Sequence, residues 1–353
     1  MLRRYVAVLA ALVLAGLPGA IAQAATKPAT RDADPDLGER LIEGLATDRF
    51  LWVRNSAGGV VRFDLASGAR LKSSRTLVEI ALWRGRPVGL SAEDGKGRYV
   101  VVDLDSGQPL APALTLDLGP GRQTVALVAG EGLAVLTQDR LWMLGDGWVS
   151  HKLSEPLGHG RIVTAWHPRQ GILVGRNRGE WCGSLRWIDP ATGQLATVRR
   201  QADQREPGCE AVTALAPDRE QPDCLLAAVG LSHFMADGGV LRVCGNRSSV
   251  IFRRAVPVPT AAGAGDDEQA APLFDDFWPI FDLTASGDGW AAISQGRLFR
   301  ASKGVVTDEA LPPLTDWHGL PAAFVGDDLI MLKTDANAAF SLSGDTPLLV
   351  ARP

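Results

Sequence analysis

A short segment that ends in a tight turn recurs along the chain, and this repeat constrains the fold more than any other feature. In each copy, a run of aliphatic and β-branched residues ends in a cluster of Asp, Asn, Ser and Gly. The copies are VVRFDLASG (60–68), YVVVDLDSG (99–107), LWMLGDG (141–147), LRWIDPATG (185–193), and the weaker LRVCGNRS (241–248), RLFRASKG (297–304) and AAFSLSGD (338–345). The first four turns follow one another at steps of 39, 43 and 43 residues. A period of about 40 to 45 residues built from short strands predicts the blades of a β-propeller.

Each repeat divides into four short strands, with Gly, Asp and Asn in the joins. From Leu41 to Val350 we count seven such units. We therefore predict an all-β fold, a β-propeller of four-stranded antiparallel blades with seven blades, while six or eight blades stay open. If Leu41–Ala46 joins the last sheet, the count falls to six. A ring of blades protects strand edges that one flat sheet would expose.

Asp103 and Ser106 are predicted to be turn residues rather than a metal ligand or a nucleophile. An Asp or Ser at the start of a tight turn accepts hydrogen bonds from nearby backbone N–H groups, and Gly adopts the positive φ that the turn requires. A nucleophile or a metal loop would not be expected to recur around the ring.

The segment VTAWHPRQGILVGRN…GSLRWIDPATGQL (163–195) resembles a WD40-like or quinoprotein-like bacterial propeller repeat. The shared features are an apolar strand, a His-Pro turn, a second strand and a Trp-Ile-Asp-x-x-Thr-Gly hairpin. The resemblance extends over most of the chain at the level of the repeat, and implies a propeller with a binding or scaffold role. The Gly-His element of WD40 repeats is missing, as is the tryptophan that follows Thr-Gly in quinoprotein motifs. We therefore expect no quinone and no other cofactor.

The N-terminal residues MLRRYVAVLAALVLAGLPGAIAQA have the three parts of a secretory signal peptide. Arg3 and Arg4 precede an apolar run, and Ala22-Gln23-Ala24 forms a small-residue cleavage site. The run is shorter than the roughly 20 residues of a membrane span. We expect cleavage near Ala24 and a soluble protein that is periplasmic or secreted.

The chain is thus predicted to consist of a signal peptide (1–24), a flexible leader (25–40) and a single β-propeller domain (41–353). Removal of the signal peptide deletes two arginines and no acids, so the formal charge moves from −4 to −6. This charge argues against a general nucleic-acid binder, which carries a basic surplus. We expect no nucleic-acid partner, no stable membrane insertion and a monomer.

Four cysteines lie between Cys182 and Cys244, and an even number in an exported chain predicts two disulfides. In an up-and-down blade, the loop between the second and third strands lies at the same end as the connector to the next blade. This places Cys182 near Cys209, and leaves Cys224 and Cys244 at the opposite end. The predicted pairs are Cys182–Cys209 and Cys224–Cys244, because other pairings exceed the short Cα separation of a disulfide. The spacing gives no zinc motif, and we expect no metal.

Departures from the repeat indicate where function is added. Three enlarged segments (176–184, 230–239 and 256–280) are predicted to emerge at one end of neighbouring blades. The candidate binding residues on these segments are Arg178, Glu180, Trp181, His233, Phe234, Asp275, Asp276 and Trp278. Exposed aromatic residues beside carboxylates suit a peptide, a sugar or a basic partner, so we expect a protein or glycan partner. A purely structural role stays open, in which Trp181 covers a disulfide and Trp278 wedges between blades.

The sequence contains no G-x-S-x-G, HExxH, phosphate-binding loop or CxxCH motif. We assign no catalytic residue and predict a binding or scaffold module acting through enlarged loops on blades four to six. The alternative is a propeller enzyme, a metal-dependent hydrolase or lyase with its site in the central channel. Acids near strand starts, such as Glu43, Glu79 and Asp282, would build that site, and two or more carboxylates converging there would favour it.

Overall fold

Short apolar strands joined by polar turns build the chain from residue 41 onward. The computed structural model describes residues 41–353 apart from 56–57, 68, 94–96, 117–124, 202–209, 233–235, 258–276, 312–321, 327–328, 333–337, 342–346 and 351–353. These residues belong to the compact unit Asp34–Pro353. The predicted signal peptide and leader lie outside them, and the predicted export stays a prediction. Within the described part of the chain, no helix has the length and apolar character to cross a membrane.

The first three blades take up residues 41–152. Blade 1 consists of β1 (Leu41–Ala46), β2 (Phe50–Asn55), β3 (Gly59–Asp64) and the first half of β4 (Arg70–Trp83). Blade 2 consists of the second half of β4, β5 (Arg86–Glu93), β6 (Arg98–Asp103) and β7 (Leu114–Thr115). Blade 3 consists of β8 (Ala126–Ala129), β9 (Leu133–Leu136), β10 (Arg140–Leu144) and β11 (Trp148–Lys152). The continuous β4 pairs with β3 through one half and with β5 through the other, so the first two blades form one sheet.

The remaining four blades follow in chain order. Blade 4 consists of β12 (Arg161–His167), β13 (Gly171–Asn177), the 3₁₀ helix η3 (Gly179–Trp181), β14 (Gly183–Ile188) and β15 (Leu195–Thr197). Blade 5 consists of β17 (Val212–Pro217), β18 (Cys224–Ser232), β19 (Ala236–Cys244) and β20 (Arg247–Phe252), with β16 (Arg199–Arg200) added parallel to β20. Blade 6 consists of β21 (Asp282–Ser286), β22 (Gly289–Ser294), β23 (Arg297–Ser302) and β24 (Val305–Ala310). Blade 7 consists of β25 (Ala322–Gly326), β26 (Leu329–Leu332), β27 (Ala338–Ser341) and β28 (Pro347–Val350).

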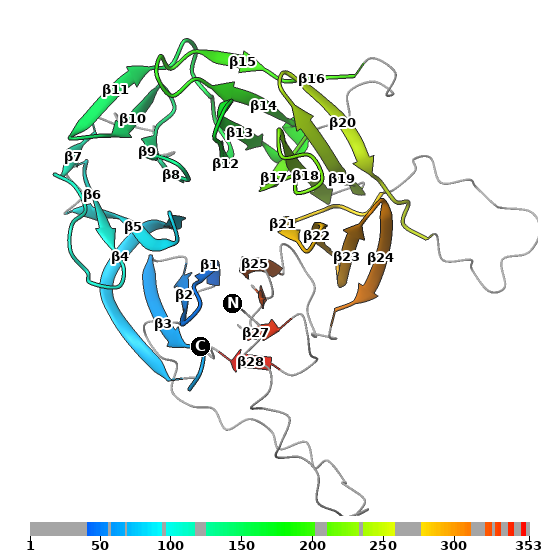
Figure 1. The fold of residues 1–353 in the computed structure, drawn as a ribbon, viewed down its shortest axis with the longest axis horizontal. Helices are drawn as coiled ribbons and strands as arrows, with labels where there is room; N and C mark the ends of the chain where they lie inside the picture. Colours follow the sequence, from blue (N-terminus) through cyan, green and yellow to red (C-terminus); the bar gives the residue numbers. More distant parts are fainter. Residues whose placement is uncertain are drawn as a thin grey trace, which may run out of the picture. The chain divides into compact units, whose positions relative to one another are not determined.

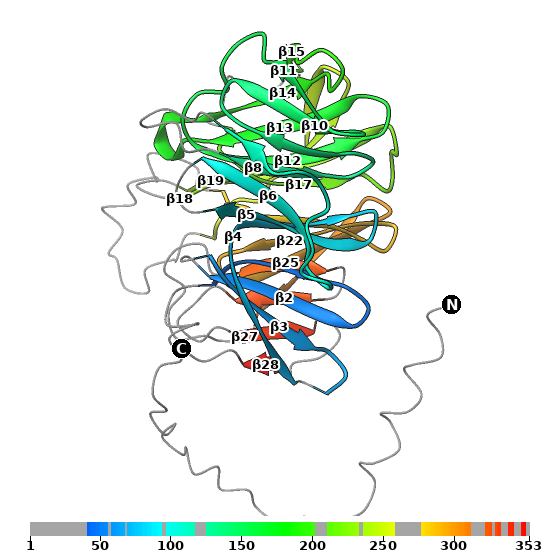
Figure 2. The ribbon, with the colours of Figure 1, turned by 90° about the vertical axis from the view of Figure 1, so that its left-hand side faces the viewer.

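The seven blades form a ring in which the first strand of each blade lies innermost (Figure 1). Neighbouring innermost strands contact one another in succession, and β25 contacts β1. Figure 2 shows the twisted sheets from the side. Because β1 pairs with β2 and belongs to the first sheet, the ring closes between blades 1 and 7 without exchange of a strand. The predicted fold class and the count of seven blades are confirmed.

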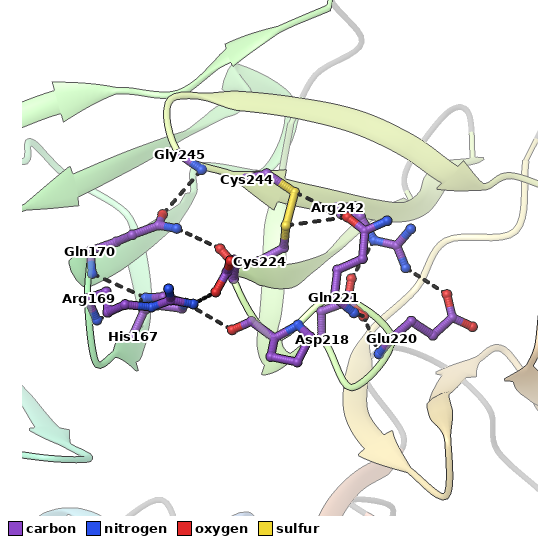
Figure 3. Close-up of a disulfide and its surroundings, with 12 residues drawn as sticks. His167, Arg169, Gln170, Asp218, Glu220, Gln221, Cys224, Arg242, Cys244 and Gly245 are labelled. Carbon is purple, nitrogen blue, oxygen red and sulfur yellow. Dashed lines mark hydrogen bonds and ion pairs between the residues drawn. A yellow bond between two sulfur atoms is a disulfide. The ribbon is translucent and has the colours of Figure 1, made fainter.

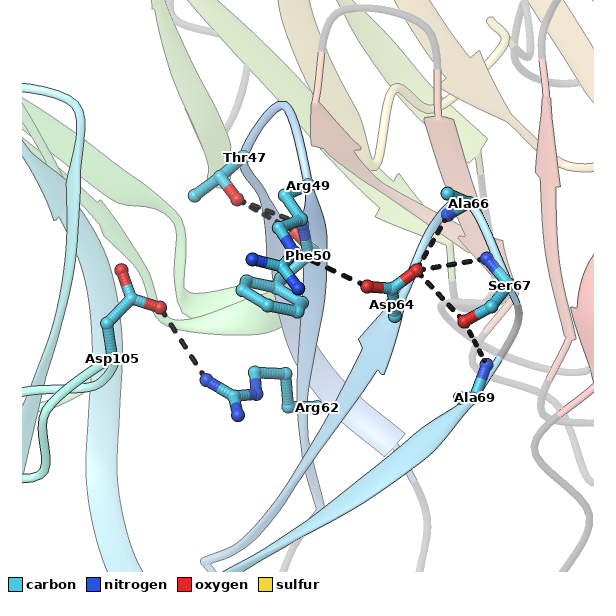
Figure 4. Close-up of polar contacts among 9 residues, drawn as sticks. All are labelled: Thr47, Arg49, Phe50, Arg62, Asp64, Ala66, Ser67, Ala69 and Asp105. Atoms are coloured by element: carbon cyan, nitrogen blue, oxygen red, sulfur yellow. Dashed lines mark hydrogen bonds and ion pairs between the residues drawn. The ribbon is translucent and has the colours of Figure 1, made fainter.

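The sequence repeat corresponds to one structural position in every blade. Its seven copies fall on the third strands and the turns that follow them, in the order β3, β6, β10, β14, β19, β23 and β27. In blade 2, Oδ1 of Asp103 accepts hydrogen bonds from the backbone N–H of Ser106 (2.8 Å) and from its hydroxyl (2.9 Å), and Gly107 has φ +69°. Asp64 accepts the same bonds from Ser67 in blade 1 (Figure 4). The predicted turn role of Asp103 and Ser106 is confirmed.

The hydrophobic core lies between neighbouring blades, because each sheet is covered on both faces. All residues of the second strands β9 and β22 are buried, whereas the outermost β24 is mostly exposed. Between blades 5 and 6, the ring of Phe252 packs against Trp290 and Phe299 with centroids 5.4 and 4.9 Å apart. Burial on both faces explains why these strands are continuous apolar runs.

Trp166 fills the join between blades 3 and 4, and two glycines make room for its ring. A Cβ built at Gly130 would lie 2.3 Å from Cβ of Trp166, and one at Gly132 would lie 2.7 Å from the far end of the indole. The turn of blade 3 therefore packs directly on the indole, an approach that only glycine permits.

Gly130→Ala should lower the free energy of unfolding by about 1–3 kcal/mol, because overpacking of this join forces the backbone or the indole to shift. Gly147→Ala is the matched control, since a Cβ at this turn glycine meets no atom within 4 Å. Denaturant unfolding measures both variants. Equal stabilities would contradict the close packing of Trp166 on the glycine turn.

Candidate functional site

The two ends of the ring are distinguished by the direction of the innermost strands. We call the end where these strands begin the front end, and the end where they finish the rear end. In blade 4, Asn177 at the end of β13 pairs with Arg161 at the start of β12 and with Gly183 at the start of β14. The loop between β13 and β14 therefore lies at the front end, as predicted for the enlarged segment 176–184.

Trp181 projects from this loop with 76% of its surface exposed. It closes η3, a turn in which the backbone N–H of Cys182 donates to the carbonyl of Gly179 (3.1 Å). The side chain of Asn177 accepts a hydrogen bond from the N–H of Gly179 (2.8 Å). Cys182 is disulfide-bonded, so the loop is held at the residue next to the exposed indole. Its predicted partner, Cys209, lies outside the described residues, and the pair Cys182–Cys209 stays a prediction.

The described charges beside Trp181 are positive. Arg178 is exposed, and Arg176 donates to the carbonyl of Leu157 (2.5 Å). Burial lowers the pKa of Arg176, and the neighbouring charges of Arg186 and Arg178 lower it further. Arg186 also pairs with Glu155 (3.2 Å), which balances its charge.

Most other predicted binding residues fall outside the described part of the chain. The backbone of Glu180 lies in η3, but its side chain is outside the described residues. His233, Phe234, Asp275 and Asp276 lie outside the described residues altogether. Trp278 is described: it is half-buried and packs edge-on against Phe299 with the centroids 6.4 Å apart. Trp278 therefore contributes to the join between blades 5 and 6, and its part in binding stays a prediction.

A small polar cavity of about 20 Å³ lies at the front end of blade 5. Glu210 and Arg200 line it, and burial raises the pKa of Glu210 while the charge of Arg200 opposes the shift. Nε of Arg200 is buried and has no hydrogen-bond partner among the described residues. A Cβ at Gly183 would lie 2.0 Å from the carbonyl oxygen of Glu210, so the Trp181 loop packs on this cavity. The volume is that of about one water molecule.

The channel carboxylates that the sequence singled out hydrogen-bond the backbone of the next blade. These bonds run from the N–H of Ile80 to Glu43 (3.3 Å), of Leu127 to Glu79 (2.5 Å) and of Phe324 to Asp282 (2.7 Å). Thr213 makes the equivalent contact by donating to the carbonyl of Ile280 (2.6 Å). These side chains therefore hold neighbouring innermost strands together.

Glu79 differs from the other carboxyls in its ionisation. Burial raises its pKa to about 8, the nearby Glu43 acts in the same direction, and the bond from Leu127 and the charges of Arg54 and Arg161 act against it. Glu43 is itself paired with Nε of Arg54 (2.7 Å). Two carboxyls thus converge at the front end of the channel. Among the described residues, no three His, Cys, Asp or Glu side chains are grouped as metal ligands.

The predicted disulfide Cys224–Cys244 is present at the rear end of blade 5 (Figure 3). The two cysteines are direct partners across β18 and β19, with Cα atoms 4.5 Å apart. Cys224 begins β18 and Cys244 ends β19, and both positions lie at the rear end of the blade. The antiparallel pairing of these two strands therefore brings the cysteines together.

A larger cavity of about 590 Å³ adjoins this disulfide at the rear end. Its lining comes from the first turns of blades 4, 5 and 6 and consists of Trp166, His167, Pro168, Pro217, Asp218, Arg219, Pro222, Cys224, Leu225, Gly287 and Asp288. Sequence patterns did not indicate this cavity and placed binding at the front end alone. The proline-rich turns HPRQG (167–171) and PDREQPDC (217–224) are the signal that could have indicated it.

No protein-family model matches the chain, and no curated protein matches its sequence. Among solved structures, a streptogramin B lyase superposes with a TM-score of 0.51 at 11% identity, covering 84% of this chain and 91% of the lyase. The computationally designed Ika8 protein gives a TM-score of 0.50 at 10% identity, covering 90% and 88%. Hsv2 from Kluyveromyces marxianus gives 0.49 at 12% identity, covering 86% and 92%. At these identities the likeness shows the fold alone, a β-propeller.

Glu79→Gln should flatten the dependence of stability on pH. The folded pKa of about 8 lies above the ordinary 4.5, so between these values the folded protein keeps a proton that the unfolded chain has lost. This contribution is complete below pH 4.5 and is lost as the pH rises through about 8. We expect the variant to melt several degrees above the wild type at pH 9 and to converge with it near pH 5.

Thermal unfolding between pH 5 and pH 9 measures this difference. The control is Glu131→Gln, which makes the same chemical change at an exposed turn residue. Parallel melting curves for the Glu79 variant and the wild type across this range would contradict the raised pKa.

Proposed function

We propose that this chain is an exported binding propeller that holds a protein or glycan partner at the front end of blades 4 and 5. The observation that carries the proposal is Trp181, which is 76% exposed on a loop held by disulfide-bonded Cys182. Exposing an indole to water is costly, and tryptophan is enriched among residues that dominate binding energy. A loop fixed beforehand also loses less conformational entropy on binding.

The charge of the described surface favours an acidic partner. Arg178 is exposed beside Trp181, and its positive charge adds to the effect of burial in lowering the pKa of the neighbouring Arg176. We propose that the partner places a carboxylate near the exposed guanidinium of Arg178 and an apolar or sugar face on the indole of Trp181.

Photocrosslinking tests this surface even while the partner is unidentified. A benzophenone amino acid at position 181 should give a discrete adduct in cells, whereas the same residue at Val149, also exposed but on the outer strand β11, should not. Trp181→Ala should weaken capture of the recovered partner at least ten-fold, because a central tryptophan contributes about 2 kcal/mol or more. Equal labelling at both positions would reject the proposal.

A second candidate function, an enzyme using the channel, is favoured by the convergence of Glu43 and Glu79 on adjacent innermost strands, together with the raised pKa of Glu79. A carboxyl that keeps its proton near neutral pH can act as a general acid, which contributes about 10²–10⁴-fold to a rate. If a panel of ester, phosphoester and uronate substrates reveals turnover, Glu79→Gln should reduce it at least hundred-fold while Trp181→Ala leaves it unchanged. Turnover that survives the Glu79 change would exclude this candidate.

A further inference from the structure

The rear cavity is larger than the cavity beside Glu210 at the front end, and the proposed function makes no use of it. Its volume of about 590 Å³ falls within the range of about 300–1,000 Å³ that is usual for small-molecule sites. Three blades contribute to it, through the turns after β12, β17 and β21. It lies at the opposite end of the ring from Trp181, so the two sites are separate.

The wall from blade 4 is fixed by His167, which is buried (Figure 3). Its Nδ1 accepts hydrogen bonds from the N–H groups of Arg169 and Gln170 (both 3.2 Å). This leaves the proton on Nε2, which donates to the carbonyl of Pro222 in blade 5 (3.2 Å). Gln170 adds a bond to the carbonyl of Asp223 (2.6 Å). The turns of blades 4 and 5 are therefore tied to each other across the cavity wall.

The wall from blade 5 is fixed in the same way by Asp218. Its Oδ1 accepts the N–H groups of Glu220 (2.9 Å) and Gln221 (3.1 Å), and its Oδ2 pairs with Arg242. The disulfide at Cys224 closes the base of this turn. A ligand thus meets a preformed cavity, which lowers the entropic cost of binding.

The surface offered to a ligand is mainly apolar and rigid. Trp166 and Leu225 line it together with three prolyl rings, those of Pro168, Pro217 and Pro222. The indole of Trp166 packs on the glycine turn of blade 3, so the prolyl rings form the apolar faces that are offered to a ligand. Prolyl C–H groups present weakly polarised faces that suit the π-face of an aromatic ring better than a flexible alkyl chain.

The charged groups around the cavity already have partners. Asp218 is paired with Arg242, Arg219 donates to the carbonyl of Gly287 (3.1 Å), and Asp288 lies 3.8 Å from Nζ of Lys303. A charged ligand would lose hydration here and would have to displace one of these contacts to gain a counter-charge. The balance of charge favours an uncharged ligand.

We propose that the rear cavity is a binding site for an uncharged aromatic small molecule, held among the prolyl rings of Pro168, Pro217 and Pro222. The volume of the cavity matches a small molecule. Its lining comes from turns and offers no exposed strand edge to which a peptide could add as a further strand. This site is independent of the front-end partner.

Fluorescence titration with N-phenylnaphthylamine, an uncharged aromatic probe, tests the site on the full protein. We expect saturable binding at least ten-fold tighter than that of its sulfonated, anionic analogue. Pro168→Asp, which places a charge in the apolar wall, should weaken binding ten-fold or more. The control Pro156→Asp changes an exposed proline that does not line the cavity and should leave affinity within two-fold.

A second variant and a mapping experiment keep the test decisive if Pro168→Asp misfolds. Pro222→Ala removes a prolyl ring but keeps the carbonyl that His167 binds, and should weaken the probe several-fold. A benzophenone photoprobe should label only peptides that contain residues 166–168, 217–225 or 287–288. Absence of saturable binding, equal loss in the Pro168 and Pro156 variants, preference for the anion, or labelling elsewhere would each overturn the proposal. None of these outcomes bears on the Trp181 partner.

Discussion

The ring depends on hydrogen bonds that join one innermost strand to the next. An innermost strand is paired on one edge only, so its other edge presents backbone groups that require partners. Glu43, Glu79 and Asp282 accept N–H groups from the following blade, and Thr213 donates to a carbonyl there. In each bond the side chain belongs to one blade and the backbone group to the next blade along the chain. Polar residues inside the ring therefore have a structural reason to be there, whatever else they do.

A second set of contacts repeats this direction at the rear end. Arg84 donates to the carbonyl of Glu131 (2.8 Å), His167 to that of Pro222 and Arg219 to that of Gly287, so first turns of blades 2, 4 and 5 each bind the next turn. With the innermost strands and rear turns both linked, the front loops can vary in length without loosening the ring. The same links make the rear cavity rigid, because its walls are the linked turns.

Sequence patterns predicted what depends on local chemistry. Asp103 and its counterparts were identifiable as turn residues, and Cys224–Cys244 followed from strand order. The unbroken β4 was not anticipated: Arg70–Trp83 contains no Gly or Pro to interrupt it. In blade 2, the outer strand shortens to Leu114–Thr115 because the prolines before it cannot donate to a ladder. The rear cavity was not predicted because its lining comes from three turns that are far apart in the chain, and each turn has the composition of an ordinary connection between strands.

The pair of Glu43 and Glu79 at the front end of the channel shows why residue type alone does not distinguish a structural carboxyl from a catalytic acid. If Glu79 holds a proton, its carbonyl oxygen still accepts the N–H of Leu127, and the repulsion with Glu43 disappears. Protonation therefore preserves the link between blades 2 and 3 while removing the one unfavourable charge contact near it. A raised pKa is then the expected result of burying a structural carboxyl next to a second carboxyl on the adjacent innermost strand. The indole of Trp181, by contrast, is 76% exposed to water, so its burial contributes little to the packing of the ring.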